Sequence, residues 1–541
     1  MKKRFLFLKL GLLGVIYALP YVFPALFVIS WVGLVPLIYF AIEHLGELTK
    51  KKAYLCGLGF GLGYYLVMYH LFINFYPMDF AGVTKQMAAA LVVVCWFGLA
   101  LVQALEFGAI TLFYRIIRPN KENPLLCGGV FCALLVLFEW QQSFFWRGVP
   151  WARLSVTQTA VPQILQSASL LGNLFVSGMI VFVNVLVCLA LKAAIPYLLS
   201  LDVKKAIATL KNSKTAIFAS AAIGIFSLNL FFGCVRCALF EDKSDRSVKA
   251  AVIQGNMSSL DKWSGADSLG LYVGLTEECV RETGANVVLW PETVIPWELT
   301  SYKHIVEDLC ELADELDITM LVGSFEAVKD EEGNRIEYNT IYMFLPDGTL
   351  AEQRYYKQKP VPFGEYNPAG PIMDLIPALD VLGVFNDPLT PGEGSQLLES
   401  QYGTIGALIC FDSIYETLAR QSVADGAEII MLSTNDSWFS DSAAVWQHNR
   451  HATVRAIENG RYVVRAASTG VSSFISPTGE VLTTIEPLTE GYMAMDVYML
   501  EGRTVYSYVG NIFVYLCLGF AVGVFAYNSV LRVRSKKKIS G

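Results

Sequence analysis

The chain has 541 residues, of which 54% are hydrophobic and 13% aromatic, and its mean hydropathy is +0.45. Only 16% of the residues are charged, where an ordinary soluble domain has about 25%. This composition excludes a wholly soluble protein and indicates that part of the chain lies in lipid. The net charge of −7 is diffuse, and no basic block lies outside the membrane flanks, so nucleic acid is not an expected partner.

Apolar runs fill residues 1 to about 240, and many have the roughly 20 residues needed to cross a bilayer core. They lie near 5–18, 24–42, 53–74, 87–114, 124–141, 162–191 and 215–238, and one more covers about 508–530. The first run is short, and the break between Pro20 and Pro24 makes the first two resemble a hairpin. The sequence therefore predicts a membrane domain at 1–240 with about seven helices, a polar domain at 241–505, and an eighth helix with a basic tail at 506–541.

Lysine and arginine residues predict the orientation of these helices, because such residues accumulate on the cytoplasmic side. Basic clusters precede the first run and follow the second, fourth and sixth runs, whereas the other connections contain few basic residues. In chain order, the four clusters are Lys2, Lys3, Arg4; Lys50, Lys51, Lys52; Arg115, Arg118, Lys121; and Lys192, Lys204, Lys205, Lys211, Lys214. Both termini are then cytoplasmic, and residues 241–505 lie outside the membrane. The external loop 144–159 contains Trp146, Trp151, Arg147 and Arg153, which either form an aromatic belt with its cations or line a platform where lipid enters the external domain.

The eleven cysteines and five histidines show no metal-ligand spacing, and no cofactor is expected. Most cysteines lie in apolar runs, where a thiol needs no partner. Cys234 and Cys237 form a CVRC pair, but no second pair and no βαβ setting supports a redox or metal motif. Cys279, Cys310 and Cys410 remain in the polar region.

Residues 241–505 alternate between apolar strands and helices, which favours an α/β fold. Strands are predicted at 248–254, 286–290, 350–356 and 405–409, and helices at 266–283, 302–316 and 443–459. In such sheets the polar residues at strand ends gather on one edge and form the site. Glu292, Lys357 and Cys410 occupy three such ends.

These three residue types suit acyl transfer. A free thiol is only a few per cent thiolate at neutral pH, so a carboxylate such as Glu292 is needed to take its proton. The Lys357 ammonium would stabilise the thiolate and then an oxyanion, and the Phe411 N–H would be a second oxyanion donor. The bland alternative is a buried core cysteine, because Cys is among the most buried residue types.

The motifs that contain these residues resemble the nitrilase superfamily, which has a glutamate, a lysine and a cysteine in this chain order. They are "WPET" with Glu292, "YYKQKPVPFGEY" with Lys357 and "LICFD" with Cys410. With "VPFGEY", "STNDSWF" and "GVPW", essentially the whole chain is similar to one family, the bacterial apolipoprotein N-acyltransferases. The resemblance implies eight membrane helices and an αββα sandwich of two sheets, located in the bacterial inner membrane with the sandwich on the periplasmic side.

The resemblance also implies a reaction and its partners. Cys410 would attack an ester of a phospholipid, Glu292 would take the thiol proton, and a lysophospholipid would leave. The α-amine of a diacylglyceryl-modified N-terminal cysteine on an apolipoprotein would then attack the thioester, giving an amide. Rival hypotheses are a membrane-anchored amidase or hydrolase with water as acceptor, an acyltransferase with another amine acceptor such as a glycolipid, and a non-enzymatic lipoprotein-binding protein.

Further positions follow from the resemblance with alternatives beside them. Glu365 would hold Lys357 or assist proton transfer, or else cap a turn. Asn339 and Trp263 would line the pocket, or be a capping amide and a core indole, while Asn435 and Trp438 would shape its wall. His448 and His451 are expected to be structural, and segment 366–400 is a candidate lid. The chain departs from the family at Phe411 and Asp412, where Tyr and Glu are usual, and at Lys359-Pro360, where His-Leu is usual.

Overall fold

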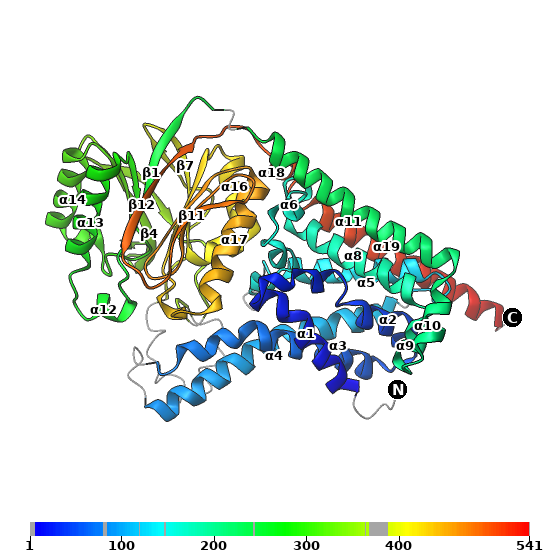
Figure 1. Cartoon of the computed structure of the whole chain (residues 1–541). Coiled ribbons are helices and arrows are strands. Elements are labelled where there is room, and N and C mark those ends of the chain that lie inside the picture. The colour runs from blue at the N-terminus through cyan, green and yellow to red at the C-terminus, as the bar shows by residue number, and fades with distance from the viewer. Residues whose placement is uncertain are drawn as a thin grey trace. The chain divides into compact units, whose positions relative to one another are not determined.

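The computed structural model describes residues 6–78, 84–117, 119–144, 148–241, 244–362, 364–366 and 388–539, without the side chains of Trp263 and 535–539. The chain forms two compact units. The helical unit comprises Met1–Ile73, Ala90–Ala238 and Val509–Gly541, and the sheet unit comprises Asn74–Ala89 and Leu239–Tyr508. Figure 1 labels the elements of both.

The helical unit consists of long apolar helices joined by short ones. Its elements are α1 (Leu6–Val22), η2 (Pro24–Trp31), α2 (Val35–Glu43), η3 (Leu45–Glu47), α3 (Lys50–Met68), η4 (Tyr69–Phe75), α4 (Lys85–Ile117), α5 (Pro124–Gln141), η6 (Pro150–Ala152), η7 (Leu154–Gln158), α6 (Pro162–Leu165), α7 (Ala168–Leu171), α8 (Asn173–Leu191), α9 (Ile195–Leu199), α10 (Val203–Leu210), α11 (Ser213–Leu239) and α19 (Ile512–Ile539). Within the described ranges, seven helical segments are long and apolar enough to cross a membrane. The chain is therefore a multi-pass membrane protein.

Two of the expected runs differ in detail. The first forms α1, which has 17 residues and contains Pro20, and is shorter than the seven spanning segments. The sixth is not one helix from 162 to 191, because Gly172 adopts φ +83° between α7 and α8. A positive φ ends a right-handed helix at little cost only at glycine, so the spanning helix begins at Asn173.

Several buried polar groups of the helical unit are hydrogen-bonded to one another, as the absence of water in a bilayer core favours. The hydroxyl of Tyr21 donates to the Ala152 carbonyl at 2.6 Å, and the hydroxyl of Tyr64 donates to Tyr21 at 2.9 Å. Arg153 is 1% exposed and donates to Ser143 Oγ at 2.6 Å. Trp151 is also buried, so this part of the loop 144–159 packs inside the unit.

The sheet unit contains twelve strands in its described residues. Its strands are β1 (Ser247–Gln254), β2 (Val287–Leu289), β3 (Thr319–Lys329), β4 (Arg335–Phe344), β5 (Leu350–Tyr356), β6 (Leu397–Ser400), β7 (Gly403–Ile409), β8 (Ile429–Thr434), β9 (Val463–Ala467), β10 (Ser472–Ile475), β11 (Val481–Ile485) and β12 (Gly491–Tyr498). Its helices are α12 (Ser259–Trp263), α13 (Ser268–Thr283), η8 (Leu299–Ser301), α14 (Lys303–Glu315), η10 (Cys410–Ile414), α16 (Glu416–Ala424), η11 (Ser437–Phe439), α17 (Ala443–Asn459) and α18 (Val505–Val509).

The strands form two six-stranded sheets, in the orders β12-β1-β2-β3-β4-β5 and β11-β10-β9-β8-β7-β6, and each sheet combines parallel with antiparallel strands. In the first sheet β1, β2 and β3 are parallel, and in the second β7, β8 and β9 are parallel. The outer strands pair antiparallel. Because parallel strands are buried on both faces, β2 and β8 are fully buried along their length.

The sheets face each other and helices cover their outer faces, so the αββα sandwich is confirmed. Figure 1 shows α13 and α14 on one outer face and α16 and α17 on the other. Tyr272 of α13, Leu309 of α14 and Trp290 belong to one buried apolar cluster beneath the first helix layer. Between the sheets, Ser433 Oγ donates to the Trp290 carbonyl at 2.9 Å.

Parallel strands place their carboxyl ends together, and the expected site residues follow such ends. Glu292 comes three residues after β2, and Cys410 and Asn435 come directly after β7 and β8. Lys357 follows the antiparallel strand β5. The predicted strands 286–290, 350–356 and 405–409 agree with β2, β5 and β7 to within two residues.

Candidate active site

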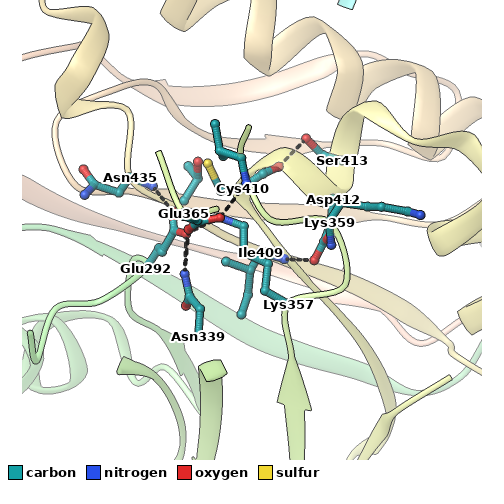
Figure 2. A network of polar contacts seen from close by, with 12 residues as sticks. Glu292, Asn339, Lys357, Lys359, Glu365, Ile409, Cys410, Asp412, Ser413 and Asn435 are labelled. Carbon is teal, nitrogen blue, oxygen red and sulfur yellow. Dashed lines mark hydrogen bonds and ion pairs between the residues drawn. The ribbon is translucent and has the colours of Figure 1, made fainter. Parts of the chain in front are cut away.

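Glu292 lies at the centre of a buried polar cluster (Figure 2), and its side chain accepts three hydrogen bonds. Lys357 Nζ and Asn339 Nδ2 each lie 2.8 Å from Oε1 of Glu292. The backbone N–H of Asn435 donates to Oε2 at 2.8 Å. A carboxylate has about four acceptor positions, so the described residues leave one on Oε2 for a further proton donor.

A close approach of two backbones fixes the turn that carries Glu292. A Cβ on Gly323 of β3 would lie 2.4 Å from the Pro291 carbonyl oxygen and 2.9 Å from the Glu292 Cα. The next residue, Thr293, adopts φ +45°, a conformation that costs a non-glycine residue about 1–3 kcal/mol. The Glu292 turn is therefore held by its surroundings, and Gly323 is the residue that makes room for it.

Lys357 joins Glu292 to a second carboxylate. Its Nζ lies 2.7 Å from Oε1 of Glu365, whose Oε2 accepts the N–H of Val361 at 2.7 Å. Lys357 and Glu292 are 2% and 4% exposed. Burial alone would lower the pKa of Lys357, but the two carboxylates outweigh it and hold that pKa well above its usual value. Lys357 is thus a fixed cation, because a buried charge has to be paired with opposite charges.

The segment 366–400, expected to be a lid, is hydrogen-bonded through its backbone to Lys357 and Glu365. The N–H of Gly392 donates to the Lys357 carbonyl at 2.8 Å, and the N–H of Leu389 donates to the Glu365 carbonyl at 3.0 Å. Residues 367–387, most of that candidate lid, lie outside the described residues. The described end of the segment is therefore anchored directly to two residues of the cluster.

Cys410 stands at the turn from β7 into η10 in a conformation that L-residues rarely adopt, with φ +49°. Its carbonyl accepts hydrogen bonds from Ser413 Oγ at 2.8 Å and from His448 Nε2 at 3.1 Å. Burial and the Glu292 charge raise the pKa of the thiol well above its usual value, although Lys357 acts in the opposite direction. The resting group is therefore a neutral thiol close to a carboxylate and an ammonium.

The two residues after Cys410 support the turn. Asp412 accepts the Lys359 N–H at 2.8 Å, the Tyr355 hydroxyl at 2.8 Å and the Ile409 N–H at 3.1 Å. Burial raises the pKa of Asp412 to about 6. These contacts fasten the end of β5 to the end of β7. Phe411 is buried, and its ring packs edge-on against the ring of Tyr415, with 5.7 Å between the ring centroids.

The other expected residues lie in different places. Asn435 is 8% exposed, and its Nδ2 donates to Ser259 of α12 at 2.9 Å. Trp438, in η11, is 40% exposed. Trp263 ends α12, and its side chain is outside the described residues, as is Trp146. Trp151 belongs to the helical unit, whereas Glu292 belongs to the sheet unit.

Two features of the site were missed by sequence reasoning. Lys262 of α12 is 3% exposed, and its Nζ donates to the carbonyls of Thr293 and Glu292 at 3.1 and 3.4 Å. Burial lowers the pKa of Lys262 to about 8, although the Glu292 charge opposes this shift. His448 contacts the Cys410 carbonyl. The only sequence signals were a lysine beside Trp263 and a histidine in a helix, and neither is specific.

The arrangement can activate a thiol for attack on a carbonyl carbon. A nucleophile, a carboxylate with a free acceptor position and a fixed ammonium are the groups that acyl transfer through a thioester requires. In the described ranges no three His, Cys, Asp or Glu side chains gather as a metal site.

Two protein families match separate parts of the chain. Residues 249–503 match the family model described as carbon-nitrogen hydrolase, and residues 13–186 match the apolipoprotein N-acyltransferase N-terminal domain. The first match covers the sheet unit and the second covers much of the helical unit.

Curated relatives are similar over nearly the whole length. The apolipoprotein N-acyltransferase of Geobacter metallireducens is 27% identical over 530 residues, which cover 96% of this chain and 94% of the relative. The same enzyme of Haemophilus influenzae is 25% identical, covering 93% and 91%. Among solved structures, Saccharomyces cerevisiae Nit3, a member of the nitrilase superfamily, aligns with 20% identity and a TM-score of 0.37, covering 49% of this chain and 94% of Nit3. The two domain matches and the full-length relatives together show that this chain belongs to the apolipoprotein N-acyltransferase family, a family of acyltransferase enzymes within the nitrilase superfamily.

Proposed function

We propose that this enzyme moves a fatty acyl chain from a phospholipid to the α-amine of a diacylglyceryl-modified N-terminal cysteine on apolipoproteins, through a thioester on Cys410. The observation that carries the proposal is the buried Lys357 ammonium held between Glu292 and Glu365 beside a raised-pKa thiol. The names of the relatives supply the acceptor class. The spanning helices suit substrates that remain anchored in a bilayer.

In the first half-reaction the Cys410 sulfur attacks the ester carbonyl carbon of the phospholipid. The thiol proton passes to the open acceptor position on Glu292, and the C–O bond to the glycerol breaks. Glu292 then returns that proton to the departing lysophospholipid oxygen, so that atoms and charge balance. The Lys357 ammonium and the Phe411 N–H stabilise the intermediate oxyanion.

In the second half-reaction the acceptor amine attacks the thioester. Glu292 takes the amine proton and passes it to the sulfur as the C–S bond breaks, which regenerates the neutral thiol that the raised pKa of Cys410 favours. A thioester is reactive enough to acylate an amine, whereas the amide product is stable. The reaction is therefore driven toward the mature lipoprotein.

The positions of the basic clusters support a location in the bacterial inner membrane with both termini cytoplasmic. The sheet unit would then be periplasmic, where apolipoproteins with lipid anchors are exposed. The variant Asp330→Cys, altered in a turn of the sheet unit, tests this orientation. In intact spheroplasts a membrane-impermeant thiol reagent should label the new cysteine.

The reaction is tested with membranes containing the wild type, Cys410→Ser or Cys310→Ser and a phospholipid with a labelled acyl chain. We expect a hydroxylamine-sensitive label on the wild type and on Cys310→Ser, whose altered thiol is a half-buried one in the same unit. Cys410→Ser should carry no such label. Equal labelling of Cys410→Ser would overturn the nucleophile assignment.

The acceptor is tested by adding a diacylglyceryl peptide and measuring the mass of its N-terminus. A mass increase of one acyl chain is the expected result. Release of free fatty acid with an unchanged peptide would instead identify a hydrolase, and transfer to a different amine would identify another acceptor.

A further inference from the structure

A buried charged network lies behind the nucleophile, on the side of α17, and the reaction described above does not use it. His448 Nδ1 lies 2.8 Å from Asp436 Oδ1, and Arg465 donates to the other carboxylate oxygen at 2.7 Å. All three side chains are at most 1% exposed. Burial would raise the pKa of Asp436, but Arg465 and His448 hold that pKa well below its usual value. Asp436 is thus a buried anion that fixes the imidazole ring.

The other ring nitrogen of His448 faces the nucleophile residue. Nε2 lies 3.1 Å from the Cys410 carbonyl oxygen and 3.1 Å from Ser413 Oγ, and Ser413 itself donates to that carbonyl at 2.8 Å. A carbonyl oxygen only accepts hydrogen bonds. Because the Ser413 proton is already directed to the carbonyl, Nε2 must carry a proton to satisfy both of its contacts.

The protonation of Nδ1 does not alter this conclusion. Arg465 lies 3.2 Å from Nδ1 and Asp436 lies 2.8 Å from it. If Nδ1 is protonated it donates to Asp436, and if not it accepts from Arg465. In both cases Nε2–H donates to the Cys410 carbonyl.

The peptide bond between Cys410 and Phe411 connects this network to the reaction. In a trans peptide the C=O and the following N–H point to opposite sides. The carbonyl faces His448 of α17, so the Phe411 N–H points away from α17, the helix that covers the outer face of its sheet (Figure 1). Glu292 and Lys357 follow strands β2 and β5 of the opposite sheet. A donor at the carbonyl polarises the peptide and makes its N–H a stronger donor.

We propose that His448, fixed by Asp436 and Arg465, is a positioning residue that orients and polarises the Cys410–Phe411 peptide so that its N–H stabilises the oxyanion. This inference rests on the proposed acyl transfer, and it gives a function to a histidine that the sequence indicated to be structural. It also explains how Cys410 is held at φ +49°, since two donors hold its carbonyl in place.

The inference separates two reactions of the same thiol. Acylation by p-nitrophenyl butyrate passes through an oxyanion: sulfur attacks the ester carbon, Glu292 takes the thiol proton and p-nitrophenolate leaves. Alkylation by iodoacetamide displaces iodide at a saturated carbon and forms no oxyanion. A residue that acts on the oxyanion donor changes the first rate selectively, whereas a residue that merely supports the fold changes both.

The variants are chosen to keep or remove one contact each in the full-length protein in detergent. His448→Asn can still reach Asp436 but loses the donor to Cys410, while His448→Gln retains an amide N–H near the Nε2 position. Ser413→Ala removes the other donor to the same carbonyl. His451→Asn is the matched control, since His451 is equally buried on the same helix.

We expect His448→Asn to slow acylation about tenfold, less than the 10²–10³ of losing an oxyanion donor itself, with the alkylation rate of the Cys410 peptide unchanged within about twofold. His448→Gln should be intermediate, Ser413→Ala should shift the ratio of the two rates in the same direction, and His451→Asn should leave it unchanged. If His448→Asn does not fold, the other two site variants decide the question.

Equal losses of acylation and alkylation, or no selective loss in any site variant, would overturn the inference. If p-nitrophenyl butyrate acylates the wild type but a phospholipid does not, the proposed donor fails and the role of His448 stands. If neither ester acylates Cys410, the proposed function and the inference both fail.

Discussion

Glu292 and Glu365 are bound to one ammonium group: Lys357 Nζ lies 2.8 Å from Oε1 of the first and 2.7 Å from Oε1 of the second. Asn339 Nδ2 donates to the same two oxygens, at 2.8 and 3.4 Å. Glu292 follows β2 and Glu365 lies in a turn beyond β5, but the two carboxylates form one electrostatic unit. Of the two, Glu292 is the carboxylate whose charge raises the pKa of the Cys410 thiol, so the two glutamates are expected to act differently.

Glu365→Gln should slow acyl-enzyme formation about 10- to 100-fold, because it removes one of the two charges that hold Lys357. Glu292→Gln should have the larger effect, about 10²–10⁴-fold, as expected for loss of a general base. Single-turnover formation of the thioester measures both rates. The control is Glu326→Gln. Glu326 is a buried carboxylate of β3 that pairs with Arg354 at 3.2 Å, outside the cluster. Equal rates in Glu365→Gln and the control would contradict the prediction.

Gly323→Ala should reduce acyl-enzyme formation by displacing Glu292. The added Cβ would lie 2.4 Å from the Pro291 carbonyl oxygen, a backbone atom that cannot rotate away, so the turn has to move. A 1 Å displacement of a catalytic group costs about 10²-fold. Gly274→Ala provides the control, because no atom lies within 4 Å of a Cβ at that exposed helical position. An unchanged rate in Gly323→Ala would show that the turn adapts without loss.

The stability contributed by Asp412 should fall as the pH rises. Its pKa is raised by burial to about 6 in the folded protein, from an ordinary value of 3.8, so between these values the folded state binds a proton that the unfolded state does not. By linkage, the free energy of unfolding then decreases by up to roughly 3 kcal/mol from pH 4 to pH 7. Thermal melts of the wild type and Asp412→Asn across that range measure the difference.

As the pH is lowered from 7 to 4, the free energy of unfolding of the wild type should rise relative to that of Asp412→Asn. Asp330→Asn provides a comparison of opposite sign, since a hydrogen bond from Asn334 lowers the pKa of Asp330. Lowering the pH should therefore not stabilise the wild type relative to Asp330→Asn. A difference between the wild type and Asp412→Asn that stays constant with pH would show that the buried carboxylate keeps an ordinary pKa.

Glu292→Gln should make the Cys410 thiol easier to alkylate even though it slows acyl transfer. Burial is the main cause of the raised pKa of Cys410, and the Glu292 charge is the next. Removing that charge leaves Lys357 to favour the thiolate, and each pKa unit recovered raises the thiolate fraction about tenfold. Iodoacetamide labelling of the Cys410 peptide at pH 8 measures the change, with the Cys310 peptide as internal reference. Slower labelling of Cys410 in the variant would refute this account.

Several features of the fold and the site follow from local patterns in the sequence. Hydropathy marks the spanning segments because a bilayer core requires about 20 apolar residues. Alternation of strands and helices predicts an α/β domain, and the family resemblance adds the two-sheet sandwich. Lys357 and Cys410 directly follow β5 and β7, and Glu292 follows β2 by three residues. These predictions succeed because each depends on one element and its immediate flank.

Boundaries set by single residues are harder to predict. The run 162–191 is continuous in hydropathy, yet Gly172 divides it because its backbone turns left-handed there. Likewise, the sequence predicts either an aromatic belt or a platform for lipid in the loop 144–159, but Trp151 and Arg153 are buried in the helical unit. Hydropathy averages over many residues, so it does not register one φ angle or one buried arginine.

The sequence alone determined that a thiol, a carboxylate and an ammonium follow strand ends of an α/β domain attached to membrane helices. Only the tertiary structure decided what holds them: Asn435 donates its N–H to Glu292, 143 residues away in the chain, and His448 donates to the Cys410 carbonyl across 38 residues. Such partners depend on the register of two sheets and the placement of α17, which arise from packing of the whole unit. Residue type and spacing therefore indicate which groups react, while the packing sets their protonation and orientation.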